Sequence, residues 1–284
     1  MDVDRAYRLC AQITRREARN FYYAFLSLPK RPRLAVYALY AFCRASDDLV
    51  DEAGATKQKR AELGRLRERL AKAADGIPEP GIDLALADAI ERFGVDPDDL
   101  ADVLSGMEMD LDLRRLETVD ALRDYCYHAA SAVGLAALPI LNAGVPPTDA
   151  MRAAAVDLGL GMQYVNIVRD VAEDLDRDRI YLPQEEMAAF DVTDQTLSGR
   201  SMTDELRALL THQADRAGDF LSRGLRLLPH LPRSGRRCPW LLAELYGRIL
   251  GRIREAGYDV FRERMSLSKA EKVWILLASR WKRL

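Results

Sequence analysis

The sequence predicts an all-α protein that forms one domain. Apolar residues recur at helical spacing along almost the whole chain, and no pair of alternating segments is typical of paired strands. No linker divides the 284 residues, and no repeat recurs at a period of roughly 20–50 residues. We therefore expect a single domain over residues 1–284, built from long helices around a shared core.

The first half of the chain predicts six helices. Pro29 and Pro32 close the second of them, and prolines and a glycine at 78–81 separate the fourth from the fifth. Asp96 is the expected N-cap of the sixth, with Pro97 at its first position. These helices cover residues 3–19, 21–28, 34–51, 57–74, 83–93 and 97–113, and the segment 21–28 either continues the first helix or bends away as a second one.

The second half predicts five more helices around one irregular stretch. A long helix rich in small residues ends before Pro146 and Pro147, and another long helix follows. We expect residues 176–200 to be irregular. The helices cover residues 118–142, 148–175, 202–228, 238–256 and 267–282.

Composition excludes two classes of protein. Apolar residues make up 49% and charged residues 30%, which excludes a disordered chain. The 42 basic and 44 acidic residues give a net charge of -2, so we expect no nucleic-acid partner.

The cysteines and the apolar segments indicate a cytoplasmic protein. Cys10, Cys43, Cys126 and Cys238 are scattered without a CxxC pair, as free thiols are in a reducing compartment. No apolar segment is long enough for a membrane span, and the first residues contain no signal core. Peripheral docking on the inner face of the membrane is compatible with both observations. Nothing in the sequence indicates the oligomeric state.

A first acidic stripe lies in the segment YAFCRASDDLVDE. Tyr40, Arg44, Asp47 and Asp51 stand at positions i, i+4, i+7 and i+11. Eleven residues at about 100° each return to within about 20° of the starting direction. The four side chains therefore share one face of the predicted helix.

A second stripe lies in the segment QYVNIVRDVAEDLDRDRIYLP. Gln163, Asn166, Asp170 and Asp174 stand at positions i, i+3, i+7 and i+11. The two amides fall inside an otherwise apolar helix, where a polar group without a partner is costly.

Together the stripes predict a metal-dependent diphosphate site. Carboxylates four residues apart repel each other, but two such helices facing one another surround a hard cation with oxygen atoms. Arg44 and Arg169 stand beside the acids, where they can hold phosphate oxygens. A solvated acidic face is the alternative, because a single match of this kind is expected by chance about once in such a chain.

The sequence resembles the squalene/phytoene synthase family from about Phe21 to Leu277. The matching segments include NFYYAFLSLP, GMEMDL, YCYHAASAVG, LYGRILGRIREAGYDVF and both acidic stripes. The C-terminal LSKAEKVWI is most similar to bacterial presqualene diphosphate synthases. The resemblance implies an isoprenoid-synthase helical bundle around a central active-site cavity. It also implies Mg²⁺-dependent head-to-head condensation of two prenyl diphosphates.

The resemblance also implies roles for individual residues. The metal ligands would be Asp47, Asp51, Asp170 and Asp174, with Asp48 and Glu173 as secondary members. The diphosphate would be held by Arg44 and Arg169, and the site would be lined by Gln163 and Asn166. The aromatic groups facing the cations would be Tyr40, Tyr125 and Tyr246.

Two features of the remaining sequence bear on this resemblance. The family often has Arg-Gly-Arg before Tyr-Leu-Pro, whereas this chain has Asp178 in place of the glycine. A third acidic run of Glu108, Asp110 and Asp112 is expected to be a solvated helix face.

The apolar lining bears on the length of the substrate. Phe21 and Phe25 would lie along the tail tunnel, and a ring at Phe25 is typical of members that use farnesyl tails. Small residues would let two tails lie side by side, or would only permit close packing of helices. They include Ala129, Val133, Gly134, Ala155 and Gly159.

We therefore expect a prenyltransferase that joins two farnesyl diphosphates to presqualene diphosphate, and on to squalene if reduction follows. The alternative is a phytoene synthase that uses two geranylgeranyl diphosphates. An alternative of another class is a non-catalytic relative with a lipid-binding or assembly role. Mg²⁺ is the expected cofactor, and NADPH use is left open because the sequence has no nicotinamide fingerprint.

Overall fold

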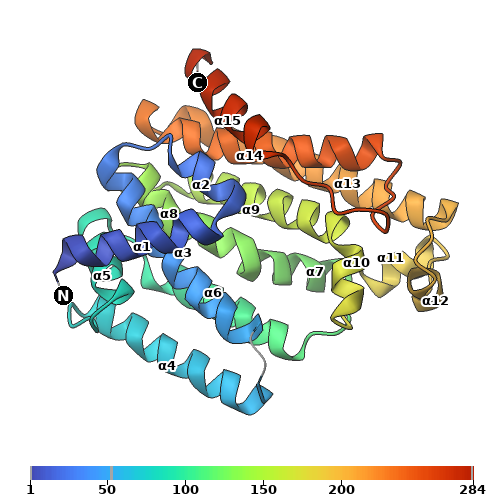
Figure 1. The fold of residues 1–284 in the computed structure, drawn as a ribbon, viewed down its shortest axis with the longest axis horizontal. Helices are drawn as coiled ribbons and strands as arrows, with labels where there is room; N and C mark the ends of the chain where they lie inside the picture. Colours follow the sequence, from blue (N-terminus) through green and yellow to red (C-terminus); the bar gives the residue numbers. More distant parts are fainter. Residues whose placement is uncertain (1, 52–53, 283) are drawn as a thin grey trace.

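The chain folds as an all-helical single domain (Figure 1). The computed structural model describes residues 2–51, 54–282 and 284, apart from the side chains of Arg19 and Asp51. Within these ranges the only strand-like pairing is one isolated bridge between Arg115 and Ile180.

The N-terminal helices are α1 (Val3–Glu17), α2 (Arg19–Phe25), α3 (Lys30–Asp51), α4 (Thr56–Ala74), α5 (Ile82–Phe93) and α6 (Pro97–Asp112). The central elements are α7 (Val119–Cys126), the π-helical turn η1 (Tyr127–Ser131), α8 (Ala132–Leu141), α9 (Asp149–Arg169) and α10 (Val171–Asp176). The C-terminal elements are α11 (Gln184–Ala189), α12 (Asp194–Ser198), α13 (Asp204–Gly224), the 3₁₀ turn η2 (Leu225–His230), α14 (Arg233–Glu255), α15 (Lys269–Ala278) and the 3₁₀ turn η3 (Ser279–Trp281).

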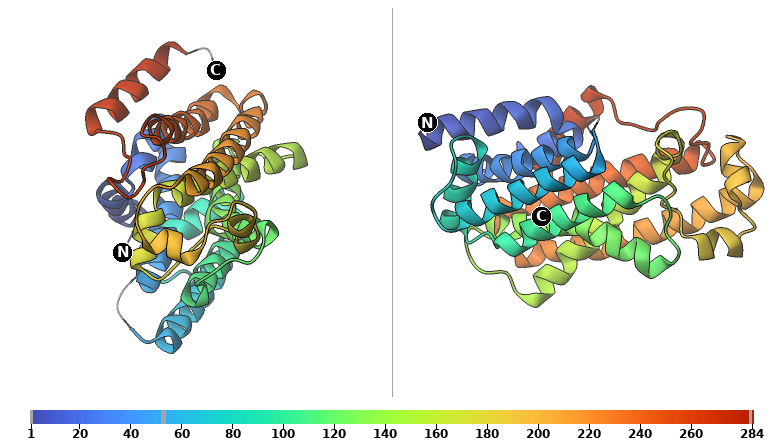
Figure 2. Two further views of the ribbon diagram at one scale, coloured as in Figure 1. Left: turned by 90° about the vertical axis from the view of Figure 1, so that its right-hand side faces the viewer. Right: turned by 90° about the horizontal axis from the view of Figure 1, so that it is seen from below.

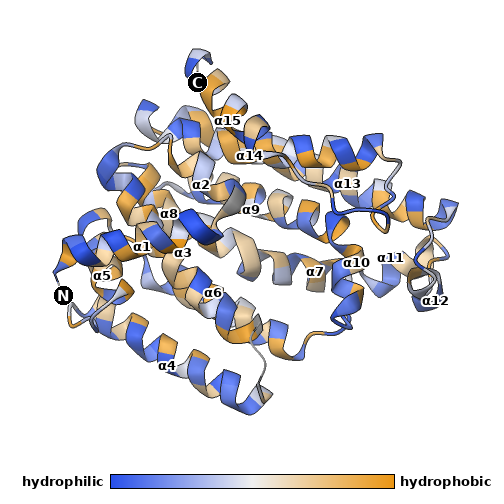
Figure 3. Cartoon of the chain, in the orientation of Figure 1, coloured by the Kyte–Doolittle hydropathy of each residue, from blue (hydrophilic) through white to orange (hydrophobic). Residues whose placement is uncertain are grey.

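The most apolar helix, α8, lies in the centre of the bundle. Leu135, Leu138 and Ile140 are all nearly inaccessible to solvent although they point in different directions, as expected for a helix that is apolar all round. Helices α3, α6 and α9 pack against it, and α9 packs extensively on α13. The hydrophilic α4 lies at one edge of the molecule, and α15 lies at the opposite edge (Figures 1, 2 and 3).

The helix expected over residues 118–142 is interrupted by η1. Two glycines let neighbouring helices approach this turn closely. A Cβ added to Gly159 would lie 2.5 Å from the Ser131 Cα, and one added to Gly106 would lie 2.9 Å from the His128 carbonyl carbon. A π-helical turn widens the backbone locally and is often found at functional sites.

The helix expected over residues 148–175 is also divided. Asp170 has φ -102° and ψ 12°, so α9 ends before it and α10 starts after it. Backbone hydrogen bonds still join Asp170 to Asn166 and Asp174 to Asp170, which keeps the second stripe together across the break.

Other boundaries differ from the predictions for local reasons. Pro32 lies in the first turn of α3, which begins at Lys30, because proline is tolerated there. The stretch 176–200, predicted to be irregular, contains α11 and α12. Asp178 has φ 56°, in the left-handed region that favours glycine, which explains the glycine that the family often has at this position. Throughout the described ranges, no helix is both long and apolar enough to cross a membrane.

Candidate active site

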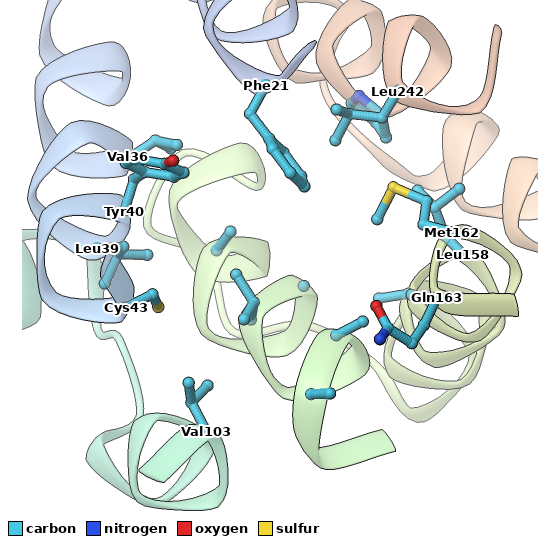
Figure 4. Close-up of a pocket in the computed structure, with 18 of the residues that line it drawn as sticks. Phe21, Val36, Leu39, Tyr40, Cys43, Val103, Leu158, Met162, Gln163 and Leu242 are labelled. Carbon is cyan, nitrogen blue, oxygen red and sulfur yellow. The ribbon is translucent and has the colours of Figure 1, made fainter. Parts of the chain in front are cut away.

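A largely apolar cavity of about 360 Å³ opens between α2, α3, α8, α9 and α14. Figure 4 shows Phe21, Tyr40, Leu158 and Gln163 directed into this space. Val36 and Asp47 both line it from α3, and eleven residues of helix correspond to about 16 Å. The lining of the cavity therefore extends for about 16 Å along α3, and Asp47 lies in the last turns of this helix.

Small side chains form one wall of the cavity. Ala129 comes from η1, Val133 and Gly134 come from α8, and Ala155 and Gly159 come from α9. All five line the cavity, so the predicted small-residue wall is present. Close packing and cavity space coincide here, because Gly159 both touches η1 and borders the cavity.

Four aromatic rings gather in the lining of the cavity, and we call them the aromatic cluster. The Phe21 ring centroid lies 6.0 Å from that of Phe25 and 6.3 Å from those of Tyr40 and Tyr246. Burial raises the pKa of Tyr246, so its phenol stays protonated. Aromatic faces attract cations, so these rings can stabilise a positive charge in apolar surroundings.

A basic pocket of about 440 Å³ adjoins the cavity at this cluster. Phe21, Tyr40 and Tyr246 border both spaces. Arg169, Arg264 and Lys272 belong to the lining of the basic pocket only. A molecule with an anionic head and an apolar tail can therefore place each part in its own space, with the junction at the aromatic rings.

The first acidic stripe lies at the entrance of the cavity. Arg44 donates to the Asp47 carboxylate at 2.8 Å and also contacts Asp48. Tyr40, Arg44 and Asp47 all line the cavity, as a shared helix face requires. The predicted fourth member, Asp51, ends α3, and its side chain lies outside the described residues.

The second stripe is neutralised by arginines. Arg169 donates to Asp170 at 2.7 Å, and Arg264 donates to the same carboxylate at 2.9 and 3.0 Å. Burial opposes ionisation of Asp170, but the hydrogen bonds and charges of both arginines outweigh it and lower the pKa. Arg264 also pairs with Glu173 at 3.0 Å.

Asp174 is in a different electrostatic situation. Burial, with a further contribution from the Asp170 carboxylate, raises the pKa of Asp174 to about 7. Asp174 lies beside Arg179 and Tyr181. The carboxylate is costly to ionise in this setting, because the loss of hydration outweighs the attraction of the nearby arginines.

The two stripes supply oxygen donors, the type of ligand that suits a hard cation such as Mg²⁺. Asn166 donates to Gln163 Oε1 at 3.1 Å, whereas its own Oδ1 is buried and has no hydrogen-bond partner among the described residues. Amide and carboxylate oxygens are the ligands that Mg²⁺ prefers. The described acids, which exclude Asp51, form no group of three close enough to hold a metal. A metal here would compete with Arg44, Arg169 and Arg264 for the carboxylates.

The structure does not place Tyr125 on the cavity lining. Its ring stacks on Tyr181 with centroids 4.8 Å apart, and its side chain is buried. Tyr181 donates to Asp110 Oδ1 at 3.0 Å. The expectation of a solvated Asp110 is therefore wrong, because this carboxylate is buried beneath the segment that carries Tyr181.

Arg264 is a site residue that the sequence predictions missed, whereas the sequence left open whether Lys272 contacts substrate or only solvates the last helix. Lys272 lies in the segment LSKAEKVWI, but its sequence pattern does not distinguish substrate contact from solvation. Arg264 lies in the loop before α15, 94 residues from its partner Asp170, so only the tertiary fold brings the two together.

Comparison with known proteins identifies the family. Residues 14–271 match the squalene/phytoene synthase family, which covers most of the chain. The chain belongs to the squalene/phytoene synthase family. It is therefore a head-to-head prenyltransferase of the isoprenoid synthase fold, as the resemblance implied.

Relatives within the family include phytoene synthases. The chain is 37% identical to a 15-cis-phytoene synthase of Synechococcus elongatus over 92% of this chain and 88% of the relative. It is 36% identical to a chloroplastic phytoene synthase of Daucus carota over 95% of this chain and 69% of the relative.

Among solved structures, a dehydrosqualene synthase in complex with a ligand superposes with a TM-score of 0.90 at 32% identity, over 98% of this chain and 96% of the other. A squalene synthase of Alicyclobacillus acidocaldarius gives a TM-score of 0.84 at 28% identity, over 90% of this chain and 95% of the other.

Proposed function

We propose that this protein joins two geranylgeranyl diphosphates head to head, as a phytoene synthase does. The observation that carries the proposal is the 37% identity to a 15-cis-phytoene synthase over nearly the whole chain. The cavity supports it, because a long apolar space adjoins a basic pocket. The sequence favours farnesyl diphosphate and leaves geranylgeranyl diphosphate as the alternative, so this proposal reverses that preference.

The residues of the site suit the steps of such a coupling. Arg44, Arg169 and Arg264 offer planar guanidinium groups that can hold the diphosphate oxygens. The aromatic cluster faces the allylic cation left when the diphosphate departs. A double bond of the second substrate attacks this cation, and loss of a proton closes a cyclopropane ring that keeps the second diphosphate. Departure of that diphosphate, rearrangement of the ring and loss of a second proton would then give the forty-carbon hydrocarbon without a reductant. The apolar walls exclude water, which would otherwise capture the cation.

Mg²⁺ is the proposed cofactor. The residues that would hold Mg²⁺ are Asp47, Asp51, Asp170, Asp174 and the Asn166 amide oxygen, with Asp48 and Glu173 as secondary members. When bound, Mg²⁺ supplies positive charge that stabilises the departing diphosphate. Tyr125 is proposed to act as a positioning residue, since its ring supports Tyr181 near Asp174.

A second candidate uses two farnesyl diphosphates. The Phe25 ring lines the cavity, and a bulky ring shortens the space available to a tail. The superposition with a dehydrosqualene synthase supports the same candidate. Presqualene diphosphate would be the first product, and squalene would require NADPH.

The metal dependence is tested by Asp47→Asn. We expect kcat/KM with Mg²⁺ to fall by about 100-fold or more, because a neutral amide no longer helps to hold the cation that stabilises the leaving group. Asp176→Asn is the control, since Asp176 is an exposed acid in α10 that pairs with Arg200. Unchanged turnover in Asp47→Asn would contradict the metal site. Turnover absent from the wild type with either diphosphate would favour a non-catalytic relative.

A further inference from the structure

We infer that the outer face of α15 and η3 docks on a lipid surface containing anionic headgroups. We call this the C-terminal apolar face and define it by Val273, Trp274, Leu277 and Trp281. Lipid docking goes beyond the proposed function, because it concerns where the enzyme works and not which bond it makes.

The face concentrates exposed apolar surface in one place. Six large hydrophobic side chains are exposed among the described residues, and four of them belong to this face. Trp274 is 61% exposed and Trp281 is 80% exposed. The other two, Ile77 and Val145, are isolated elsewhere on the molecule, which is normal for a protein surface.

Helical geometry aligns three of these side chains. Val273, Trp274 and Leu277 fall within an arc of about 100° on α15, and Trp281 follows in the 3₁₀ turn η3. Ile275 and Ser279 are buried on the other side and hold the helix against the bundle. The element is therefore apolar on both faces. On the outer face the Arg248 guanidinium carbon lies 5.8 Å from the centroid of the Trp274 ring, and the four side chains remain exposed.

Basic residues flank the face. Lys269, Lys272, Arg280 and Lys282 lie in α15 or beside it, whereas the single acid, Glu271, is paired with Arg252. This local positive charge contrasts with the net charge of -2 for the whole chain. Exposed tryptophans with basic neighbours are typical of segments that lie in the membrane interface.

Charge also argues against a second copy of the chain as the occupant. A symmetric contact would place the lysines and arginines of one face near the same residues of the other. Anionic lipid headgroups attract these side chains, at about 1 kcal/mol for each basic residue near the surface.

The face is continuous with the rim of the active site. Lys272 lines the basic pocket, and Trp274 projects outward two residues later on the same helix. Helix α15 packs on α2, which contributes Phe21 and Phe25 to the cavity. Figures 1 and 2 show α15 at the edge of the bundle. Docking at α15 would place the active site next to the lipid bilayer, in which an apolar product dissolves.

Vesicle flotation of the full-length protein tests the proposal. We expect binding to vesicles of phosphatidylcholine and phosphatidylglycerol in equal parts, and about tenfold weaker binding to phosphatidylcholine alone. Trp274→Ala with Trp281→Ala should weaken binding to the mixed vesicles by about tenfold or more. Ile77→Ala with Val145→Ala is the matched control and should bind as the wild type does.

Two further measurements distinguish lipid docking from damage to the fold and from self-association. Turnover in vesicle-free buffer and the thermal midpoint should be equal in the wild type and the tryptophan variant, because neither tryptophan lines the cavity. Sedimentation velocity reports self-association. The proposal would be overturned if the wild type did not bind vesicles, or if the tryptophan variant bound them equally well. It would also be overturned if the wild type formed a dimer, the tryptophan variant were a monomer, and neither bound vesicles.

Discussion

Two carboxylates four residues apart in the second stripe are held in opposite electrostatic states. Arg169 and Arg264 stabilise the charge of Asp170, whereas burial and Asp170 itself oppose the charge of Asp174. Such an arrangement costs folding free energy in the metal-free protein. It becomes favourable when a cation is bound, which is a reason to assign the stripe a binding role.

Asp174→Asn should therefore stabilise the metal-free protein while it impairs catalysis. The folded-state pKa of about 7 lies above the ordinary value of Asp, so the folded state binds more protons and loses stability as pH rises toward 7. The amide removes this penalty. We expect a gain of about 1–2 kcal/mol in the free energy of unfolding at pH 8, after allowance for solvent screening.

Urea denaturation of wild type and variant at several pH values measures this effect. The gain should disappear toward pH 4, where the Asp174 carboxyl is protonated in the folded protein. A variant that is less stable than the wild type at pH 8 would contradict the account of Asp174.

Phe25 lines the cavity that we propose for the substrate tail. Phe25→Ala removes a ring from the cavity wall, so we expect the ratio of kcat/KM for geranylgeranyl diphosphate over farnesyl diphosphate to rise by about tenfold. The reason is that a longer tail gains apolar contacts in the enlarged cavity. Steady-state kinetics with each diphosphate measure the ratio. Tyr22→Ala on the same helix is a control, because Tyr22 does not line the cavity. A ratio that stays constant in Phe25→Ala would remove this ring from the determinants of chain length.

At the scale of elements, the contact between α9 and η1 shapes the cavity wall. A Cβ at Gly159 would meet backbone atoms of Ser131 at 2.5 and 2.7 Å, which a side-chain rotation cannot relieve. We expect Gly159→Ala to lower the free energy of unfolding by about 1–3 kcal/mol, as overpacked cores do. Chemical denaturation measures the change.

Gly247→Ala is the matched control within α14. A Cβ added to Gly247 would have no neighbour within 4 Å, so alanine should stabilise this helix by up to about 1 kcal/mol. Equal effects of the two substitutions would show that the close approach to η1 is not what Gly159 provides.

The elements also show where sequence reasoning succeeds. The apolar periodicity predicts nearly every long helix, and the spacing of Tyr40, Arg44 and Asp47 correctly places them on one face. The π-helical turn and the break at Asp170 leave no sequence signal, since neither needs a proline or glycine at that point. The π-helical turn lies where Gly106 and Gly159 bring neighbouring helices close to the backbone.

Contacts between distant segments are the part of the site that sequence patterns could not supply. Arg264 joins Asp170 only because the loop before α15 folds over α9 and α10. The sequence predicts a solvated Asp110 because it stands in an acidic run with Glu108 and Asp112. These two neighbours are indeed more exposed, but the Asp110 carboxylate accepts a hydrogen bond from Tyr181 and is buried. Helical spacing identifies a face but not what covers it.

At the scale of the whole molecule, the site depends on three regions of the chain that converge. The N-terminal helices supply Phe21 and Arg44, the central helices supply Asp170, and the C-terminal segment supplies Arg264. Where these regions meet, the aromatic cluster lies between an apolar cavity and a basic pocket. The proposed coupling of long prenyl diphosphates requires both spaces, one for the apolar tail and one for the anionic head.

A competition assay tests this central claim most directly. The purified protein is given equal concentrations of geranylgeranyl and farnesyl diphosphate with Mg²⁺ and without NADPH, and the products are separated and weighed by mass spectrometry. We predict a forty-carbon hydrocarbon from two geranylgeranyl units as the main product, and none when Mg²⁺ is removed by a chelator. A main product built from two farnesyl units would contradict the account.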